Sequence, residues 1–110
     1  MNDGEAALKG IPFNLEKHVD YANGSIVSKM LIKKDIGNIT LFAFDAGQGL
    51  SEHTAPFDAV VYILDGRAEI MMGEKTSTVN AGELVIMPAN VPHALHAKER
   101  FKMFLVMIRG

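Results

Sequence analysis

The sequence predicts an all-β fold, a barrel or a sandwich of short strands. Segments rich in Val, Ile, Leu and Met recur from residue 25 onward, and Gly, Pro, Asn and Asp separate them at short, regular intervals. No segment has the apolar spacing of a long amphipathic helix. The sequence shows no repeat or low-complexity tract, so its 110 residues are expected to form one domain.

The elements follow one another in two parts. Residues 1–24 form an N-terminal segment that we expect to be partly extended and packed on the strands or on a partner, with the first ten residues frayed. Residues 25–110 form the barrel, where 35–38 marks a hairpin turn and Gly47 and Gly49 mark a connection. Strands are predicted over 25–33, 39–45, 60–64, 68–72, 75–79, 84–87, 93–97 and 101–109.

Composition excludes several classes of function. Eleven basic residues stand against 13 acidic ones for a charge of -2, and no basic cluster exceeds Lys33 and Lys34, so no nucleic-acid partner is expected. The absence of cysteine excludes thiol nucleophiles and thiolate metal sites. The longest apolar runs, 59–64 and 103–108, are far shorter than the roughly 20 residues of a membrane span. Since residues 1–7 also lack the features of a secretion signal, we expect a cytoplasmic protein without a membrane partner.

Two strands are apolar on both faces. Neither 60–64 nor 104–108 alternates as a strand between core and solvent should. Their second face must be covered by another sheet, by the N-terminal segment or by a partner subunit. We therefore expect a homodimer, while burial of both faces within one chain stays open as the alternative.

Two segments carry patterned glycines, histidines and prolines. In 47–66 a glycine precedes His53 by six positions, and in 82–97 a Gly-x5-Pro pattern leads to His93. They resemble the two cupin motifs, Gly-x5-His-x-His followed by Glu and Gly, and Gly-x5-Pro-x-Gly-x2-His-x3-Asn, with Asn90 where the family has glycine. The resemblance, over about half of the chain, implies a small single-domain cupin of the superfamily, an RmlC-like jelly roll or double-stranded β-helix barrel.

In cupins, two histidines and a glutamate of the first motif and one histidine of the second hold a divalent metal inside the barrel. When the resemblance is followed position by position, the four ligand positions correspond to His53, Ala55, Ala59 and His93 of this chain. It therefore implies a degenerate metal site, in which two imidazoles converge in one enclosed pocket opposite two methyl groups. Two imidazoles alone can take Zn, Ni or Fe, so we expect one divalent metal or none.

Three further residues flank this set. Asp58 is one place before the glutamate position; a β-bulge near Pro56 would turn it inward as a third ligand, and otherwise it accepts backbone hydrogen bonds. His96 follows His93 by three residues, which places it on the other face of a regular strand and makes it the weakest metal candidate. Met87 suits either an irregular apolar ligand or the core.

Three functions remain open, and the sequence assigns no catalytic residue. The first is binding of a small molecule inside the barrel. The second is a metal-dependent enzyme, an oxygenase, isomerase or lyase, and the third is a dimerisation module without a ligand. For the first, the expected pocket consists of His53, Ala55, Ala59, Met87 and His93.

Overall fold

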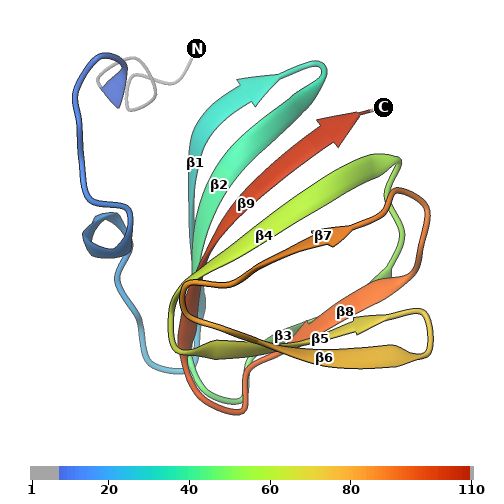
Figure 1. Cartoon of the computed structure of the whole chain (residues 1–110). Coiled ribbons are helices and arrows are strands. Elements are labelled where there is room, and N and C mark those ends of the chain that lie inside the picture. The colour runs from blue at the N-terminus through green and yellow to red at the C-terminus, as the bar shows by residue number, and fades with distance from the viewer. Residues whose placement is uncertain (1–7, 110) are drawn as a thin grey trace.

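The computed structural model of the protein describes residues 8–109, and this part of the chain contains nine β-strands in two antiparallel sheets (Figure 1). One sheet has the order β1-β2-β9-β4-β7 and the other the order β3-β8-β5-β6. A short 3-10 helix, η1 (Glu16–His18), precedes them. The strands are β1 (Ile26–Lys34), β2 (Gly37–Phe44), β3 (Gly49–His53), β4 (Phe57–Asp65), β5 (Arg67–Met72), β6 (Lys75–Asn80), β7 (Leu84–Met87), β8 (His93–His96) and β9 (Phe101–Arg109).

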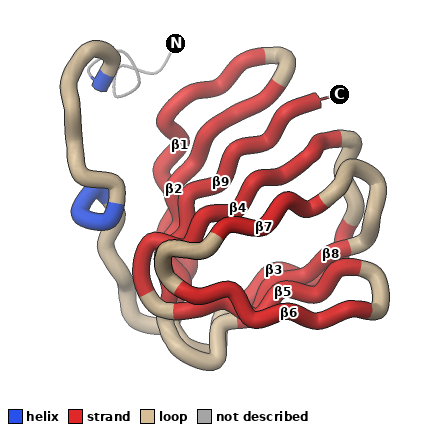
Figure 2. The backbone as a smooth tube through the Cα atoms, viewed as in Figure 1, coloured by secondary structure: helices blue, strands red, loops and turns tan. Residues whose placement is uncertain are grey.

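The two sheets form two layers that face each other (Figure 2). Strands far apart in the sequence are neighbours, since β9 lies between β2 and β4, and β8 lies between β3 and β5. This interleaved antiparallel arrangement confirms the all-β fold of a double-stranded β-helix. Among the described residues, no helix is long and apolar enough to cross a membrane.

Eight of the nine strands were predicted, and β3 was not. We expected a connection there because Gly47 and Gly49 interrupt the pattern, and the strand, Gly-Leu-Ser-Glu-His, has one large apolar side chain. That side chain, Leu50, packs against the core, and the strand forms through its ladder with β8. Pairing with a distant strand therefore overrides a weak local pattern. Strand β4 also begins at Phe57 and not at residue 60.

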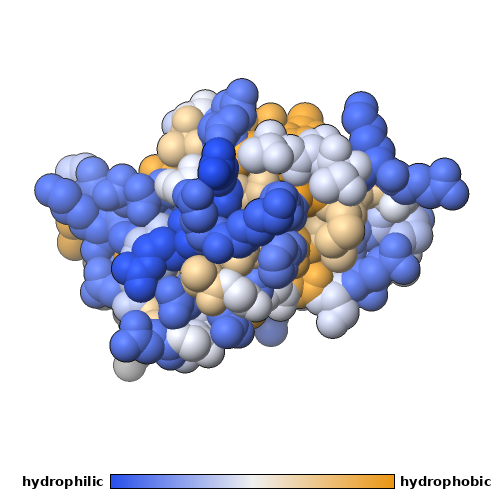
Figure 3. Space-filling view, turned by 90° about the horizontal axis from the view of Figure 1, so that it is seen from below, coloured by the Kyte–Doolittle hydropathy of each residue, from blue (hydrophilic) through white to orange (hydrophobic). Residues whose placement is uncertain are grey.

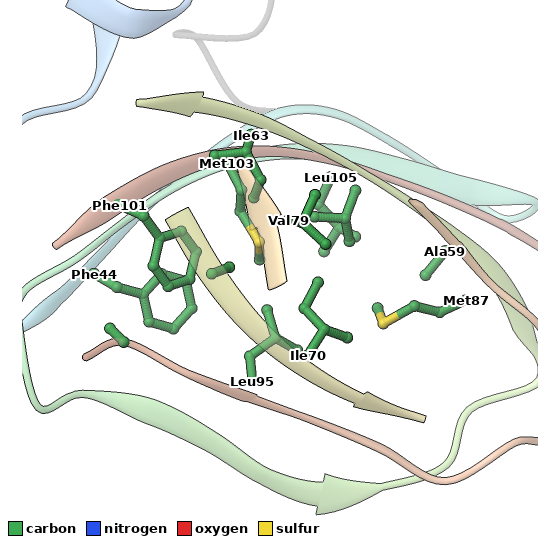
Figure 4. Packing of buried hydrophobic residues seen from close by; sticks show 13 residues of the cluster. Phe44, Ala59, Ile63, Ile70, Val79, Met87, Leu95, Phe101, Met103 and Leu105 are labelled. Carbon is green, nitrogen blue, oxygen red and sulfur yellow. The ribbon is translucent and has the colours of Figure 1, made fainter. Parts of the chain in front are cut away.

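The main core fills the space between the two sheets (Figure 4). Phe44 and Phe101 are ladder partners whose rings stack with centroids 4.6 Å apart, and they occupy one end of the core. Ala59 and Met87 lie toward the other end. Each large side chain that is fully buried here contributes about 1.5–3 kcal/mol through the hydrophobic effect. The phenylalanine end is therefore closed by packed side chains.

A second cluster lies on the outer face of the five-stranded sheet. Residues 8–24, which we call the strap, run along this face beside β1 (Figure 1). Val19 of the strap is fully buried against Leu41 and Ala43, which point outward from β2. The strap thus covers the second apolar face of β2 from within the chain. Fraying was expected for residues 1–10. Residues 1–7 lie outside the described part of the chain, whereas Leu8 packs against this second cluster.

Polar contacts fasten the strap to the end of β4 and the start of β9. The Tyr21 hydroxyl donates a hydrogen bond of 2.6 Å to Asp65 Oδ2, and the buried Lys102 Nζ donates one of 2.7 Å to the carbonyl oxygen of Glu16. The Arg100 guanidinium lies 4.5 Å from the centroid of the Tyr21 ring. Burial, and then the hydrogen bond to Asp65, raise the pKa of Tyr21 above its ordinary value.

The turn between β4 and β5 requires glycine. Gly66 has φ +73°, and a Cβ at this position would lie 2.2 Å from the carbonyl oxygen of Arg100. An L-residue is strained in this left-handed conformation, and the neighbouring backbone leaves no room for a side chain. The close approach of these two backbone segments holds β4 beside the start of β9.

Candidate functional site

Two histidines meet at the end of the barrel opposite the phenylalanine stack. His53 is the last residue of β3 and His93 the first of β8, and they are ladder partners. Their ring centroids lie 4.4 Å apart with an interplanar angle of 67°, an edge-to-face contact. His93 is buried with 7% of its surface exposed, whereas His53 is exposed. The pair therefore spans the boundary between the barrel interior and solvent.

The exposure of His53 corrects the expectation that both imidazoles are enclosed. β3 is an edge strand of its sheet, and its ladder with β8 shifts register between Leu50 and His53. Such an irregularity bends a strand and re-aims the side chains that follow it. The His53 ring consequently lies against the buried His93 ring from the solvent side, at the mouth of the barrel.

Both rings are oriented by the main chain. His53 Nδ1 lies 2.7 Å from the carbonyl oxygen of Ser51, and His93 Nδ1 lies 3.2 Å from that of Val91. A carbonyl oxygen can only accept, so each Nδ1 carries the hydrogen and donates it. In a neutral imidazole the remaining nitrogen, Nε2, then has a lone pair. Each histidine can thus offer Nε2 to a ligand or a metal ion.

The loop before β8 contains a left-handed residue at Asn90, the position where the cupin motif has glycine. Asn90 adopts φ +65°, the left-handed conformation that asparagine tolerates better than most residues. Its N–H donates to the Ala55 carbonyl oxygen over 2.9 Å, and the Gly73 N–H donates to the Pro92 carbonyl oxygen over 2.8 Å. These bonds join the loop to the β3–β4 connection and to the β5–β6 turn, and so fix where His93 enters β8.

Methyl groups and thioethers face the barrel interior, and one of them, that of Met72, neighbours the pair. Ala59 is 3% exposed and pairs with Met87 on β7 and Met107 on β9. Met72 on β5 is the ladder partner of His93 and packs against the main core. Ala55 is half-buried in the β3–β4 connection. The residues that sequence reasoning missed are Met72 and Met107, and the period-2 alternation of β5 and β9 is the signal that points both inward.

Asp58 and His96 do not join the pair. Asp58 is exposed, and its Oδ1 accepts a hydrogen bond of 2.9 Å from the Ala89 N–H. This is the alternative to metal binding that the sequence left open, a carboxylate that accepts a backbone hydrogen bond. His96 is exposed on the outer face of the four-stranded sheet, opposite Glu69, beside an open concavity of about 670 Å³. Surface on this side of the molecule is largely hydrophilic (Figure 3).

The four positions implied as metal ligands therefore hold two imidazoles and two methyl groups. Among residues 8–109, no group of three or more His, Cys, Asp or Glu side chains is placed to hold a metal ion. The complete three-histidine, one-glutamate ligand set does not fit this site. An ion bound to the pair would have to take its remaining ligands from water or from a bound molecule.

Comparison with known proteins agrees with this architecture. The family model described as "Cupin domain" matches residues 40–109. A conserved protein of unknown function from Streptococcus pyogenes is 37% identical, with a TM-score of 0.88 over 92% of this chain and 89% of that one. A cupin superfamily protein from Desulfitobacterium hafniense is 26% identical, with a TM-score of 0.87 over 93% of this chain and 94% of that one.

Two further relatives are matched over about half of their length. A cupin 2 conserved barrel domain protein from Leptotrichia buccalis is 41% identical, with a TM-score of 0.85 over 87% of this chain and 47% of that one. An uncharacterised protein of Streptomyces coelicolor is 37% identical over 59 residues, which are 54% of this chain and 56% of the relative. The matched region thus spans about half of the length of these two relatives.

Proposed function

This chain belongs to the cupin family, and from that premise we propose that its barrel binds a small molecule at the mouth, near His53 and His93. One observation carries the proposal: the two rings lie in contact, with both Nδ1 atoms engaged by backbone carbonyls and both Nε2 atoms left to a ligand. A polar pair beside an apolar wall is the usual composition of a small-molecule site.

The wall beside the pair suggests the chemistry of the ligand. Ala59 and Met87 belong to the apolar core that lines the barrel interior, and a thioether can shift to accommodate an irregular apolar shape. A neutral imidazole accepts a hydrogen bond at Nε2, whereas a protonated one donates there. The ligand that fits is therefore small, with an apolar body and one hydroxyl or carboxyl group that meets the imidazoles.

The experiment is shift mapping by nuclear magnetic resonance with a panel of small phenols and aliphatic acids. We expect methyl signals of Ala59 and Met87 and ring signals of His93 to move together. The double variant His53→Ala, His93→Ala should lose these shifts, whereas His96→Ala, on the outer face, should keep them. Shifts that survive in the double variant, or none with any probe, would contradict the proposal.

A metal-dependent oxygenase, isomerase or lyase is the second candidate. Metal-binding histidines commonly donate their other ring nitrogen to a carbonyl oxygen, as both Nδ1 atoms do here. His53 and His93 would supply two Nε2 ligands to Zn, Ni or Fe, and the ion would polarise a substrate oxygen. Elemental analysis of the parent and of the double alanine variant separates the two candidates. Only the metal-dependent enzyme should contain metal in the parent and lose it when both histidines are replaced.

A further inference from the structure

A methionine stands beside the histidine pair in the same sheet. Met72 on β5 is the ladder partner of His93 on β8, and His53 on β3 is the partner of His93 on its other side. Because the strand order is β3-β8-β5, the three side chains form one row across adjacent strands. Residues directly opposite each other in a ladder point to the same face, with Cβ atoms about 4.5–5.5 Å apart. His93 therefore lies between an imidazole and a thioether.

The row runs from the mouth of the barrel into its interior. His53 lies on the solvent side, with its ring centroid 4.4 Å from that of His93. His93 is buried, and Met72 packs against the main core. Neighbouring strands lie about 4.8 Å apart, a distance that a histidine or methionine side chain can span when it leans toward the middle of the row. An ion bound to the His93 ring can thus be reached by ligands from both sides.

The two rings are prepared to give nitrogen ligands. Both Nδ1 atoms donate to carbonyl oxygens, those of Ser51 and Val91, which leaves a lone pair on each Nε2. A hydrogen bond of this kind at the second ring nitrogen fixes the orientation of a metal-binding imidazole and raises its basicity.

No carboxylate accompanies these nitrogens. The buried polar side chains of the described residues are those of Thr40, His93 and Lys102, and none of them is acidic. Within residues 8–109, no third His, Asp or Glu completes a metal-binding group. The further donor that the ladder places beside the pair is the sulfur of Met72. Thioether sulfur is a soft ligand that selects Cu(I), and imidazole suits copper as well as zinc.

We propose that His53 Nε2, His93 Nε2 and Met72 Sδ together bind one Cu(I) ion. The inference rests on the second candidate of the proposed function, a metal held by the histidine pair, and it names a softer ion and a third protein ligand. A dication costs about four times as much to desolvate as a monocation of the same size, because the Born energy rises with the square of the charge. Since no carboxylate offsets the charge here, the site favours the monovalent ion.

Competition with bicinchoninate, a chromogenic Cu(I) chelator, tests the site in the whole 110-residue chain, with ascorbate under argon. The parent should bind one equivalent. Met72→Leu conserves volume and removes the sulfur, so it should fold like the parent but lose at least about tenfold in Cu(I) affinity. Met71→Leu is the matched control, because this neighbouring side chain points to the opposite face of β5 and is 37% exposed. It should bind Cu(I) like the parent.

X-ray absorption at the copper edge supplies a readout that a change in packing alone would not move. Copper in the parent should have one sulfur neighbour, and copper in Met72→Leu only nitrogen or oxygen neighbours. Circular dichroism of the metal-free proteins checks that both are folded, and the spectrum of the parent decides even if the variant is not. No Cu(I) binding by the parent, copper without a sulfur neighbour, or equal affinity in folded Met72→Leu overturns the proposal.

Failure of this inference and failure of the proposed function give different results. Small molecules are mapped on copper-free protein, and a Zn(II) titration reports metal binding that needs only the two rings. Zn(II) that binds the parent and is lost from the double variant His53→Ala, His93→Ala supports a metal held by the pair. If Cu(I) affinity is then indifferent to Met72, the copper site alone is overturned.

Discussion

Replacing Tyr21 by phenylalanine removes one hydroxyl from the contact that fastens the strap. The ring remains, together with its contacts to the Arg100 guanidinium and the Lys102 ammonium. What is lost is the 2.6 Å hydrogen bond to the Asp65 carboxylate. A hydrogen bond to a charged group contributes about 1.5–3 kcal/mol, and a half-buried one falls at the lower end because water can replace the hydroxyl. We expect Tyr21→Phe to lower the free energy of unfolding by about 1.5 kcal/mol, or Tm by about 6 °C.

The same variant should change stability at alkaline pH. Folding raises the pKa of Tyr21, first through burial and then through the hydrogen bond to Asp65. The ionised phenolate therefore disfavours the folded state, and the stabilisation is complete below the unfolded value of about 10 and declines as pH rises above it. Urea unfolding at a series of pH values should show this decline in the parent and a shallower one in Tyr21→Phe.

Tyr62→Phe is the matched control for this experiment. Tyr62 is the only other tyrosine of the chain and lies on the outer face of β4, away from the strap. Its hydroxyl can be removed without touching the strap contacts, so the control should unfold like the parent. The role of this hydrogen bond is refuted if Tyr21→Phe has the same free energy of unfolding as Tyr62→Phe and loses it equally fast as the pH rises. In that case the Tyr21 hydroxyl does not hold the strap.

Two further substitutions test backbone and charge contacts. Gly66→Ala combines left-handed strain with a Cβ placed 2.2 Å from the Arg100 carbonyl oxygen, whereas Gly73→Ala, at φ +60° in open space, carries the strain alone. By urea denaturation we expect a loss of about 1–2 kcal/mol for Gly73→Ala and at least twice that for Gly66→Ala, and equal losses would contradict the close-approach argument. Lys102→Met keeps an apolar stem but removes the hydrogen bond to the Glu16 carbonyl oxygen, so we expect a loss of about 1.5–3 kcal/mol and faster amide exchange throughout the strap. Strap exchange that stays at the parent rate would count against this role of Lys102.

Local patterns predicted most of the fold. Strands β7 and β9 have their expected bounds, because apolar runs end there at Gly, Pro or charged residues. Strand β3 was missed because its pairing with β8, and not its own composition, makes it a strand. The path of the strap was beyond prediction for a similar reason. Its burial depends on Val19 meeting side chains of β2 that local sequence does not bring together.

The candidate site, too, was predicted in part. That His53 and His93 lie together follows from two motifs carried by the family framework, and the rings are in contact. The exposure of His53 could not be predicted, since it follows from an irregular ladder at a sheet edge. The inward methionine Met72 was visible in principle from strand alternation, but only the ladder identifies it as the neighbour of His93. Binding of a ligand or of a metal ion by His53 and His93 stays a prediction.

The carbonyl groups that hold the two imidazoles come from positions two residues upstream in each case. Every amino acid supplies such a group, so the side chains at positions 51 and 91 can drift without altering which ring nitrogen is free. Substitutions at these two positions should therefore leave the orientation of both imidazole rings unchanged. Relatives that keep the two histidines can then differ widely around them and still share one recognition chemistry.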